Sequence, residues 1–222
     1  MLFDLRSRGR RRTVQVVYLG LALLMGGGLV LFGVGAGNGI GGLLNAFTGN
    51  GSGNAQSTVV SAQEKAALRQ TKLDPSNPSA WSSLVMARWG SASSNAADYN
   101  PSTNTYPAAG RRELAATTSA WERYLQLTKS PDPNVAILAA RAYAFLGNYA
   151  GAAGAWEIQA LADPSTAKGY ECLAVTAYAA KQTRKGDLAL AKALSLTPQL
   201  SRKMLKTEIQ AAQTTPSIAQ SC

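Results

Sequence analysis

The chain of 222 residues has a net charge of +10, no histidine and two cysteines. The lack of histidine removes the commonest general base and metal ligand, and no phosphate-binding, dinucleotide-binding or serine-nucleophile motif occurs. We therefore expect no enzyme and no cofactor or metal site. Aromatic residues are only 7% of the chain, and alanine supplies much of its apolar fraction, which favours an all-α fold of closely packed helices. The positive charge is scattered beyond residue 12, so no nucleic-acid partner is expected.

A basic arm begins the chain, and a long uncharged segment follows it. Residues 1–12 carry five arginines and one aspartate, and no charged residue then occurs before Glu64. Residues 14–34 are almost wholly apolar, and a helix of that length, at ~1.5 Å per residue, spans the roughly 30 Å of a bilayer core. These features predict an uncleaved transmembrane signal anchor over 13–36. The arginines keep the N-terminus on the cytoplasmic side of the membrane and place the chain after the anchor on the extracytoplasmic side. A cleaved signal peptide is the alternative.

The remainder of the chain divides by composition. Residues 37–57 are rich in glycine, serine and asparagine, which predicts a flexible linker. Apolar residues then recur at steps of three and four, so that 58–213 is expected to form antiparallel helix hairpins. Within this domain, 58–73 caps the first hairpin and 200–212 the last. Residues 214–222 are expected to form a flexible tail.

Two proline-terminated segments repeat at an interval of thirty-four residues. Pro164 and Pro198 each follow an amphipathic helical segment, and each of these segments is preceded by another. Because proline cannot continue a helix, each unit is predicted to consist of a helix, a turn, a second helix and a stop. The two units cover 133–166 and 167–200, and an earlier unit is interrupted by an insertion at about 90–110.

These units resemble tetratricopeptide repeats. The matching residues of the first unit are Ala139, Ala140, Tyr143, Gly147, Ala152, Trp156 and Pro164, and those of the second are Tyr170, Leu173, Ala174, Ala193, Leu194 and Pro198. The second unit departs from the family pattern at Gly186, where alanine is usual, and at Tyr178, which comes one position late. The resemblance implies a solenoid of about three repeats with capping helices, in which Trp81, Trp121 and Trp156 belong to the core.

In that family, the first helices of the repeats line a concave groove that receives a partner segment. The resemblance implies a partner-binding groove formed by Trp89, Ile137, Arg141, Phe145, Lys168, Val175 and Tyr178. The alternative for each residue is packing against its neighbour or against the chain's own tail. If the groove is not the site, the inserted loop with Tyr99 and Tyr106 is the next candidate, because loops often carry binding residues.

The two cysteines lie far apart in the sequence and form no metal-type cluster. Cys172 falls in a first helix near the groove, and Cys222 falls on the tail. In an oxidising compartment a tail that crosses the groove would allow a disulfide between them. The alternative is a buried, unpaired Cys172 and a frayed Cys222.

A function follows from this architecture as an expectation. We expect a protein–protein interaction scaffold or holdase-like adaptor on the extracytoplasmic face of a bacterial cytoplasmic membrane, anchored in the lipid bilayer by its first helix. The layout is similar to that of the ancillary subunits of the bacterial protein-export translocon, an analogy of architecture only. The alternative is an assembly factor for an envelope complex of the cytochrome-maturation or pilus type, and an enzyme is a remote third. The sequence identifies neither the partner nor the oligomeric state.

Overall fold

The computed structural model describes residues 54–94 and 97–222. By its internal contacts the chain divides into Met1–Gln56 and Ser57–Cys222, and the description below concerns the second part. The predicted basic arm and the predicted membrane anchor over 13–36 lie outside the described residues. Within the ranges that are described, no helix combines the length and the apolar character needed to cross a membrane.

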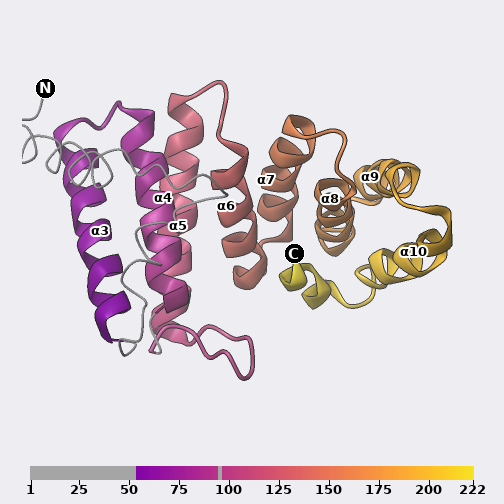
Figure 1. Cartoon of the computed structure of the whole chain (residues 1–222), viewed down its shortest axis with the longest axis horizontal. Coiled ribbons are helices and arrows are strands. Elements are labelled where there is room, and N and C mark those ends of the chain that lie inside the picture. The colour runs from indigo at the N-terminus through magenta and orange to yellow at the C-terminus, as the bar shows by residue number, and fades with distance from the viewer. Residues whose placement is uncertain (1–53, 95–96) are drawn as a thin grey trace, which may run out of the picture. The chain divides into compact units, whose positions relative to one another are not determined.

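The described part of the chain is all-α, as predicted, and its only departure from helices and loops is an isolated β-bridge between Asn100 and Thr105. Figure 1 shows the order of the elements. Their bounds are α3 Asn54–Leu73, α4 Pro78–Ser94, α5 Ala108–Leu127, α6 Pro133–Leu146, α7 Tyr149–Ala162, α8 Ala167–Ala179, α9 Thr183–Leu196, η1 Gln199–Ser201, α10 Arg202–Ala211 and η2 Pro216–Ser221.

The helices pack as successive hairpins. Helix α4 packs against α5, α6 against α7 and α8 against α9, and each hairpin also packs against the next one through α5–α6 and α7–α8 (Figure 1). Helices α6 and α8 begin thirty-four residues apart, as do α7 and α9, so the sequence interval is also a structural interval. One hairpin cannot bury its own apolar face, and stacking on a neighbour supplies the cover.

The turns between paired helices explain why the elements begin and end where they do. Gly147 ends α6 with a φ of 80°, a backbone region that favours glycine. Asn148 then caps α7 by accepting a hydrogen bond from the amide of Gly151 at 2.9 Å. Lys181, thirty-four residues after Gly147, adopts the same left-handed conformation with a φ of 61°. In this conformation the Cβ of a lysine is sterically strained, whereas glycine has no Cβ.

A ring-on-glycine contact recurs in both C-terminal hairpins. A Cβ added at Gly151 would lie 2.8 Å from the ring of Tyr143, and one added at Gly186 would lie 2.6 Å from the ring of Tyr178. In each hairpin the glycine follows the tyrosine by eight residues. In the second hairpin both residues come one position later than the thirty-four-residue interval predicts, so Tyr178 and Gly186 shift together and keep their contact. The hydroxyl of Tyr178 donates to Asp187 at 2.6 Å, and that of Tyr143 donates to a glutamate of α5 at 2.8 Å.

Large aromatic side chains occupy the core between layers of alanine. Trp121 and Trp156 are 2% and 3% exposed, which confirms the prediction that they are core residues. Trp81 is half-buried at the edge of the core and donates from Nε1 to the carbonyl of Pro75 at 3.0 Å. Small residues on the facing sides of α6, α7 and α8 allow these helices to approach closely, and the tryptophans fill the remaining space.

Two boundaries differ from the predicted ones. Helix α4 continues to Ser94 and α5 begins at Ala108, so the interruption is shorter than the predicted insertion over 90–110. The prediction of a flexible tail over 214–222 is wrong, because residues 216–221 form η2 and pack against α6 and α8. The tail packs because Ile218 and Ala219 place apolar side chains against the core.

Candidate partner-binding face

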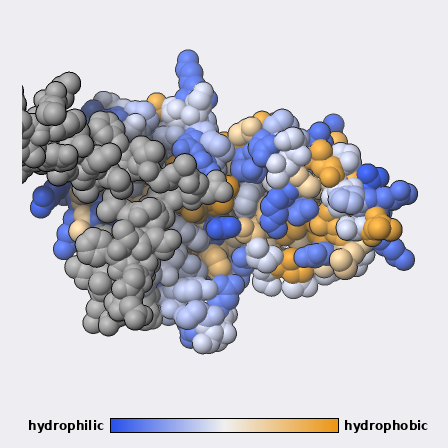
Figure 2. Space-filling model, viewed as in Figure 1, coloured by the Kyte–Doolittle hydropathy of each residue, from blue (hydrophilic) through white to orange (hydrophobic). Residues whose placement is uncertain are grey.

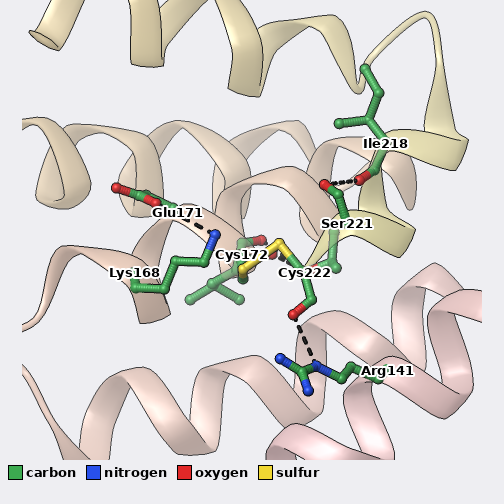
Figure 3. The surroundings of a disulfide bond; sticks show 9 residues. Arg141, Lys168, Glu171, Cys172, Ile218, Ser221 and Cys222 are labelled. Atoms are coloured by element: carbon green, nitrogen blue, oxygen red, sulfur yellow. Dashed lines mark hydrogen bonds and ion pairs between the residues drawn. A yellow bond between two sulfur atoms is a disulfide. The ribbon is translucent and has the colours of Figure 1, made fainter. Parts of the chain in front are cut away.

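The C-terminal segment lies on the first helices of the last two hairpins. Ala219 and Cys222 are 1% and 8% exposed, and Ile218 packs against the core. A disulfide joins Cys222 to Cys172 of α8, with the two Cα atoms 5.5 Å apart (Figure 3). Part of the face that the resemblance assigned to a partner is therefore covered by the chain itself.

Polar contacts hold the tail at both ends. Nε of Arg141 on α6 donates to the main-chain oxygen of Cys222 at 3.0 Å, as Figure 3 shows. At the start of the segment, Nζ of Lys181 donates to the main-chain oxygen of Gln213 at 2.6 Å. The tail is thus bound to α8 by the disulfide and to α6 by the hydrogen bond from Arg141. The same hydrogen bond orients the arginine side chain.

A cavity of about 350 Å³ remains open where the tail, α4, α6 and the 97–107 loop meet. We call it the aromatic pocket. Its lining residues are Trp89, Ser93, Tyr99, Asn104, Tyr106, Arg141, Phe145, Gln220, Ser221 and Cys222. Three regions that are distant in sequence therefore build one site: α4 with the loop that follows it, α6, and the tail.

Ring contacts fold the loop against α6. The ring centroids of Tyr99 and Tyr106 are 4.9 Å apart, and that of Tyr106 lies 4.7 Å from that of Phe145 in an edge-on arrangement. Main-chain hydrogen bonds of 2.9 and 3.2 Å join Asn100 and Thr105 within the loop. The hydroxyl of Tyr99 donates to the side-chain oxygen of Asn104 at 2.9 Å. These contacts give the loop a defined wall on the pocket side.

A close backbone approach fixes the base of the same loop. A Cβ on Gly110 would lie within bonding distance of the main-chain carbonyl of Asp98, so only glycine allows α5 to pass here. Asp98 is itself 8% exposed. The loop is therefore anchored at its base by α5 and along its side by the ring of Phe145.

The pocket is lined by one charged side chain. Arg141 is exposed, and among the described residues no aspartate or glutamate side chain lines the pocket or forms an ion pair with it. Its Nε instead donates to the main-chain oxygen of Cys222. Burial raises the pKa of Tyr106 above its usual value of 10.0, so its hydroxyl remains neutral at physiological pH. The site is therefore aromatic, with the guanidinium of Arg141 held against the tail at its edge.

The predicted groove residues have different fates in the structure. Trp89, Arg141 and Phe145 come together in the aromatic pocket. Ile137 is half-buried against the core. Lys168 is exposed and lies 3.8 Å from Glu171, outside the pocket.

Two of the predicted groove residues are not available to a partner. Val175 is 6% exposed and Tyr178 is 1% exposed, so assigning them to an open groove is wrong. The reason is that η2 covers α8, while the ring of Tyr178 turns onto Gly186 and its hydroxyl bonds to Asp187. Tyr99 and Tyr106 of the alternative site join the pocket instead. The tail crosses the groove and forms the disulfide, which is one of the two alternatives that the sequence leaves open for the cysteines.

A second cavity of about 450 Å³ lies among α7, α8 and α9, and no tail residue lines it. Leu161 and Leu188 on its rim are 69% and 67% exposed. Lys185 and Glu157 form an ion pair of 2.7 Å at its edge. On the face drawn in Figure 2, apolar surface gathers over the end of the hairpin stack that carries α8 to α10. Tyr170 and Arg184 also line this cavity, and Nζ of Lys192 lies 5.7 Å from the centroid of the Tyr170 ring.

The described residues contain no group of three or more acidic, histidine or cysteine side chains arranged to hold a metal ion. No aspartate or glutamate side chain lines the aromatic pocket, and the sulfur of Cys222 is in the disulfide. No family model, no curated protein and no solved structure matches this chain, so the pocket and the hairpin geometry carry the functional argument.

Proposed function

We propose that the protein is a non-enzymatic scaffold that holds a segment of another protein in the aromatic pocket. The pocket itself carries this proposal, because it combines four aromatic side chains, an arginine and walls from three distant regions of the chain. Interfaces concentrate binding energy in aromatic residues and arginine. A stack of hairpins with a thirty-four-residue interval is a suitable support, since it presents such a site on a rigid surface.

We infer that the hairpins belong to the tetratricopeptide class. The inference rests on the residues matched in the two C-terminal units, on the common interval of α6–α8 and α7–α9, and on the ring-on-glycine contacts within each unit. The helices α3 and α10 lie at the two ends of the stack, where such arrays carry atypical capping elements.

The proposed location is the outer face of a bacterial cytoplasmic membrane, with residues 13–36 as the anchor. Support comes from the apolar length of that segment and from the five arginines before it. A disulfide between Cys172 and Cys222 accords with an oxidising compartment. Reporter fusions test the orientation. A reporter that is active only outside the cytoplasm should work after Cys222 and fail before residue 13, and the reverse result would refute the orientation.

Site-specific photo-crosslinking of the full chain in cells tests the binding role. A photoreactive residue at Asn104, which is exposed on the pocket wall, should form a discrete adduct with a partner. The same residue at Leu188, 67% exposed and outside the pocket, is the matched control. Adducts from position 188 alone, or equal yields of the same adduct from both positions, would refute the assignment. A single stoichiometric envelope complex among the adducts would favour an assembly factor, and translocon subunits with varied clients would favour an adaptor.

A further inference from the structure

We propose that the outer face of α9, continued by η1 and α10, docks onto an anionic lipid surface. We call the exposed surface of residues 184–206 the basic face. This inference goes beyond the scaffold function and concerns a part of the molecule that is separate from the aromatic pocket. It draws on the proposed membrane anchor only as the reason why a bilayer is near.

The surplus of basic residues beyond residue 12 lies in this end of the chain. Residues 181–206 hold seven lysines and arginines and one aspartate, whereas residues 13–180 hold ten basic and nine acidic residues. The expectation of a scattered charge is therefore wrong for the last hairpin and α10. Five basic side chains of the basic face are exposed and form no ion pair among the described residues: Arg184, Lys192, Arg202, Lys203 and Lys206.

Large apolar side chains alternate with these charges. Leu188 and Met204 are 67% and 72% exposed, and Leu200 is 99% exposed. Leu161 of α7 lines the same cavity as Leu188 and Arg184. Figure 2 shows hydrophobic and hydrophilic surface side by side at the end of the stack that carries α8 to α10.

The periodicity of α9 places charge and apolar surface on one side of the helix. Its exposed side chains recur at steps of three and four: Arg184, Leu188, Ala191, Lys192 and Ser195. The buried side chains of Ala189, Leu190 and Ala193 lie on the opposite side. A single flat partner can therefore meet the cations and the leucine together.

A lipid surface suits this mixture better than a protein surface does. Protein interfaces are enriched in aromatic residues and depleted in lysine. Helices that lie on a bilayer instead combine leucine with lysine and arginine. Residues 184–206 include no aromatic residue. Anionic headgroups would pair with the cations, and the leucines would enter the boundary between headgroups and acyl chains.

Two other partners fit the basic face less well. A second copy of this chain would bring the same positive charge, and α3 at the other end of the stack also exposes basic residues, among them Lys65, Arg69 and Lys72. Copies that met side by side or end to end would therefore repel each other. A nucleic acid would pair with the cations but would leave the leucines in water.

The proposed anchor keeps a bilayer within reach. Residues 37–57 follow it, and a segment of that length spans at most about 70 Å when fully extended. This reach allows the domain to turn its basic face toward the membrane that holds the anchor.

Lipid-dependent quenching of a probe tests the proposal on the full chain. An environment-sensitive fluorescent amino acid replaces Leu188, and the protein is reconstituted into phosphatidylcholine vesicles with or without phosphatidylglycerol. Nitroxide groups on the acyl chains should quench the probe in the anionic vesicles only. Salt should reverse the effect, because the screening length falls from about 10 Å at 0.1 M to about 3 Å at 1 M. The same amino acid in place of Leu73, 81% exposed on α3, is the matched control and should stay unquenched in both.

Variants separate the contribution of charge from that of the apolar side chains. A basic residue near an anionic surface contributes about fivefold in affinity, so Arg184→Gln/Lys192→Gln should lower the ratio of quenched to unquenched probe about twentyfold. Lys65→Gln/Arg69→Gln, which removes two exposed charges from α3, should leave that ratio unchanged. Leu200→Ser/Met204→Ser should also reduce quenching but should not change the binding of a DNA oligonucleotide, which depends on charge. Circular dichroism should show that all three variants keep their helices.

Several results would overturn the inference. These are equal quenching at positions 188 and 73, an equal loss in the two basic double variants, and a probe that responds to DNA but not to anionic vesicles, which would favour a nucleic acid. Recovery of the chain in the soluble fraction would refute the anchor alone, since vesicles added to the soluble protein repeat the same comparison. A specific adduct at position 104 together with an unquenched probe at 188 would refute lipid docking and leave the scaffold function standing.

Discussion

The disulfide between Cys172 and Cys222 should supply a large part of the stability of the last hairpin. The bond joins residues fifty apart in sequence. In the chain-entropy model, closing a loop of that length removes enough freedom from the unfolded chain to stabilise the fold by about 4 kcal/mol. This is a large fraction of the roughly 5–15 kcal/mol that holds a typical domain together. Cys222→Ala should therefore lower the free energy of unfolding by about this amount.

Urea unfolding of the Ser57–Cys222 unit, followed by circular dichroism, measures the loss. With a slope of about 1–3 kcal/mol/M, the midpoint should fall by more than about 1 M urea. Reducing the wild-type protein should reproduce the shift. The double variant Cys172→Ala/Cys222→Ala should be insensitive to the reductant, which makes it the matched control. Thiol counting confirms that the wild type starts with the bond formed.

A small change in stability would refute this reasoning. A loss below about 1 kcal/mol would mean that η2 stays docked without the bond. The packing of Ile218 and Ala219 and the contact from Arg141 would then account for the position of the tail. A loss of helix signal before the main transition, seen only in the reduced protein, would instead show that α9 and α10 separate from the rest when the tie is cut.

Five further substitutions test the fold in the same assay. Trp156→Ala should cost about 3–5 kcal/mol because this ring is buried, and Trp89→Ala, half-buried at the pocket, should cost less than half as much; equal losses would move Trp89 into the core. Gly147→Ala should cost about 1 kcal/mol because a side chain is strained at a φ of 80°, and Lys181→Gly should gain up to about 1 kcal/mol at a φ of 61°; changes of the same sign in both variants would contradict the shared geometry. Burial and the bond to a carboxylate raise the pKa of Tyr178 to about 12 in the folded state against 10.0 when unfolded, so its contribution to stability is complete below about pH 10 and is lost as the pH rises to 12. Tyr178→Phe should flatten that decline, and an unchanged pH profile would exclude the tyrosine as its source.

The sequence predicts the two C-terminal hairpins well because their signals are local. Glycine and proline mark the ends of the helices, and the spacing of alanines and rings within a few turns defines the packed faces. Helices α6 to α9 accordingly fall within the two predicted units, 133–166 and 167–200. The same reasoning finds the interrupted first hairpin but places the end of α4 too early. The serine and alanine residues there give no clear signal for the end of a helix.

The site depends on contacts that no local pattern encodes. The sequence predicts a flexible tail, yet the tail is bonded to a residue fifty positions away. The repeat interval assigns Val175 to the groove because Val175 lies in α8 thirty-four residues after Arg141 in α6, but Val175 is buried and the tail packs on the same helix. Tyr178 was misplaced for a different reason. A shift of one residue turns a side chain by about 100° around the helix, and this changes the surface it meets.

The paired contacts of Tyr143 with Gly151 and Tyr178 with Gly186 have a consequence for building new repeats from this chain. The tyrosine and the glycine eight residues after it must be transferred between repeats as a pair. Changing the position of one without the other would break their contact. A designed consensus unit that kept Tyr178 at its position but placed alanine at 186 would drive a methyl group into the ring. Transplanting both residues together, in either of the two registers, would preserve the spacing between the helices and allow units to be added to the array.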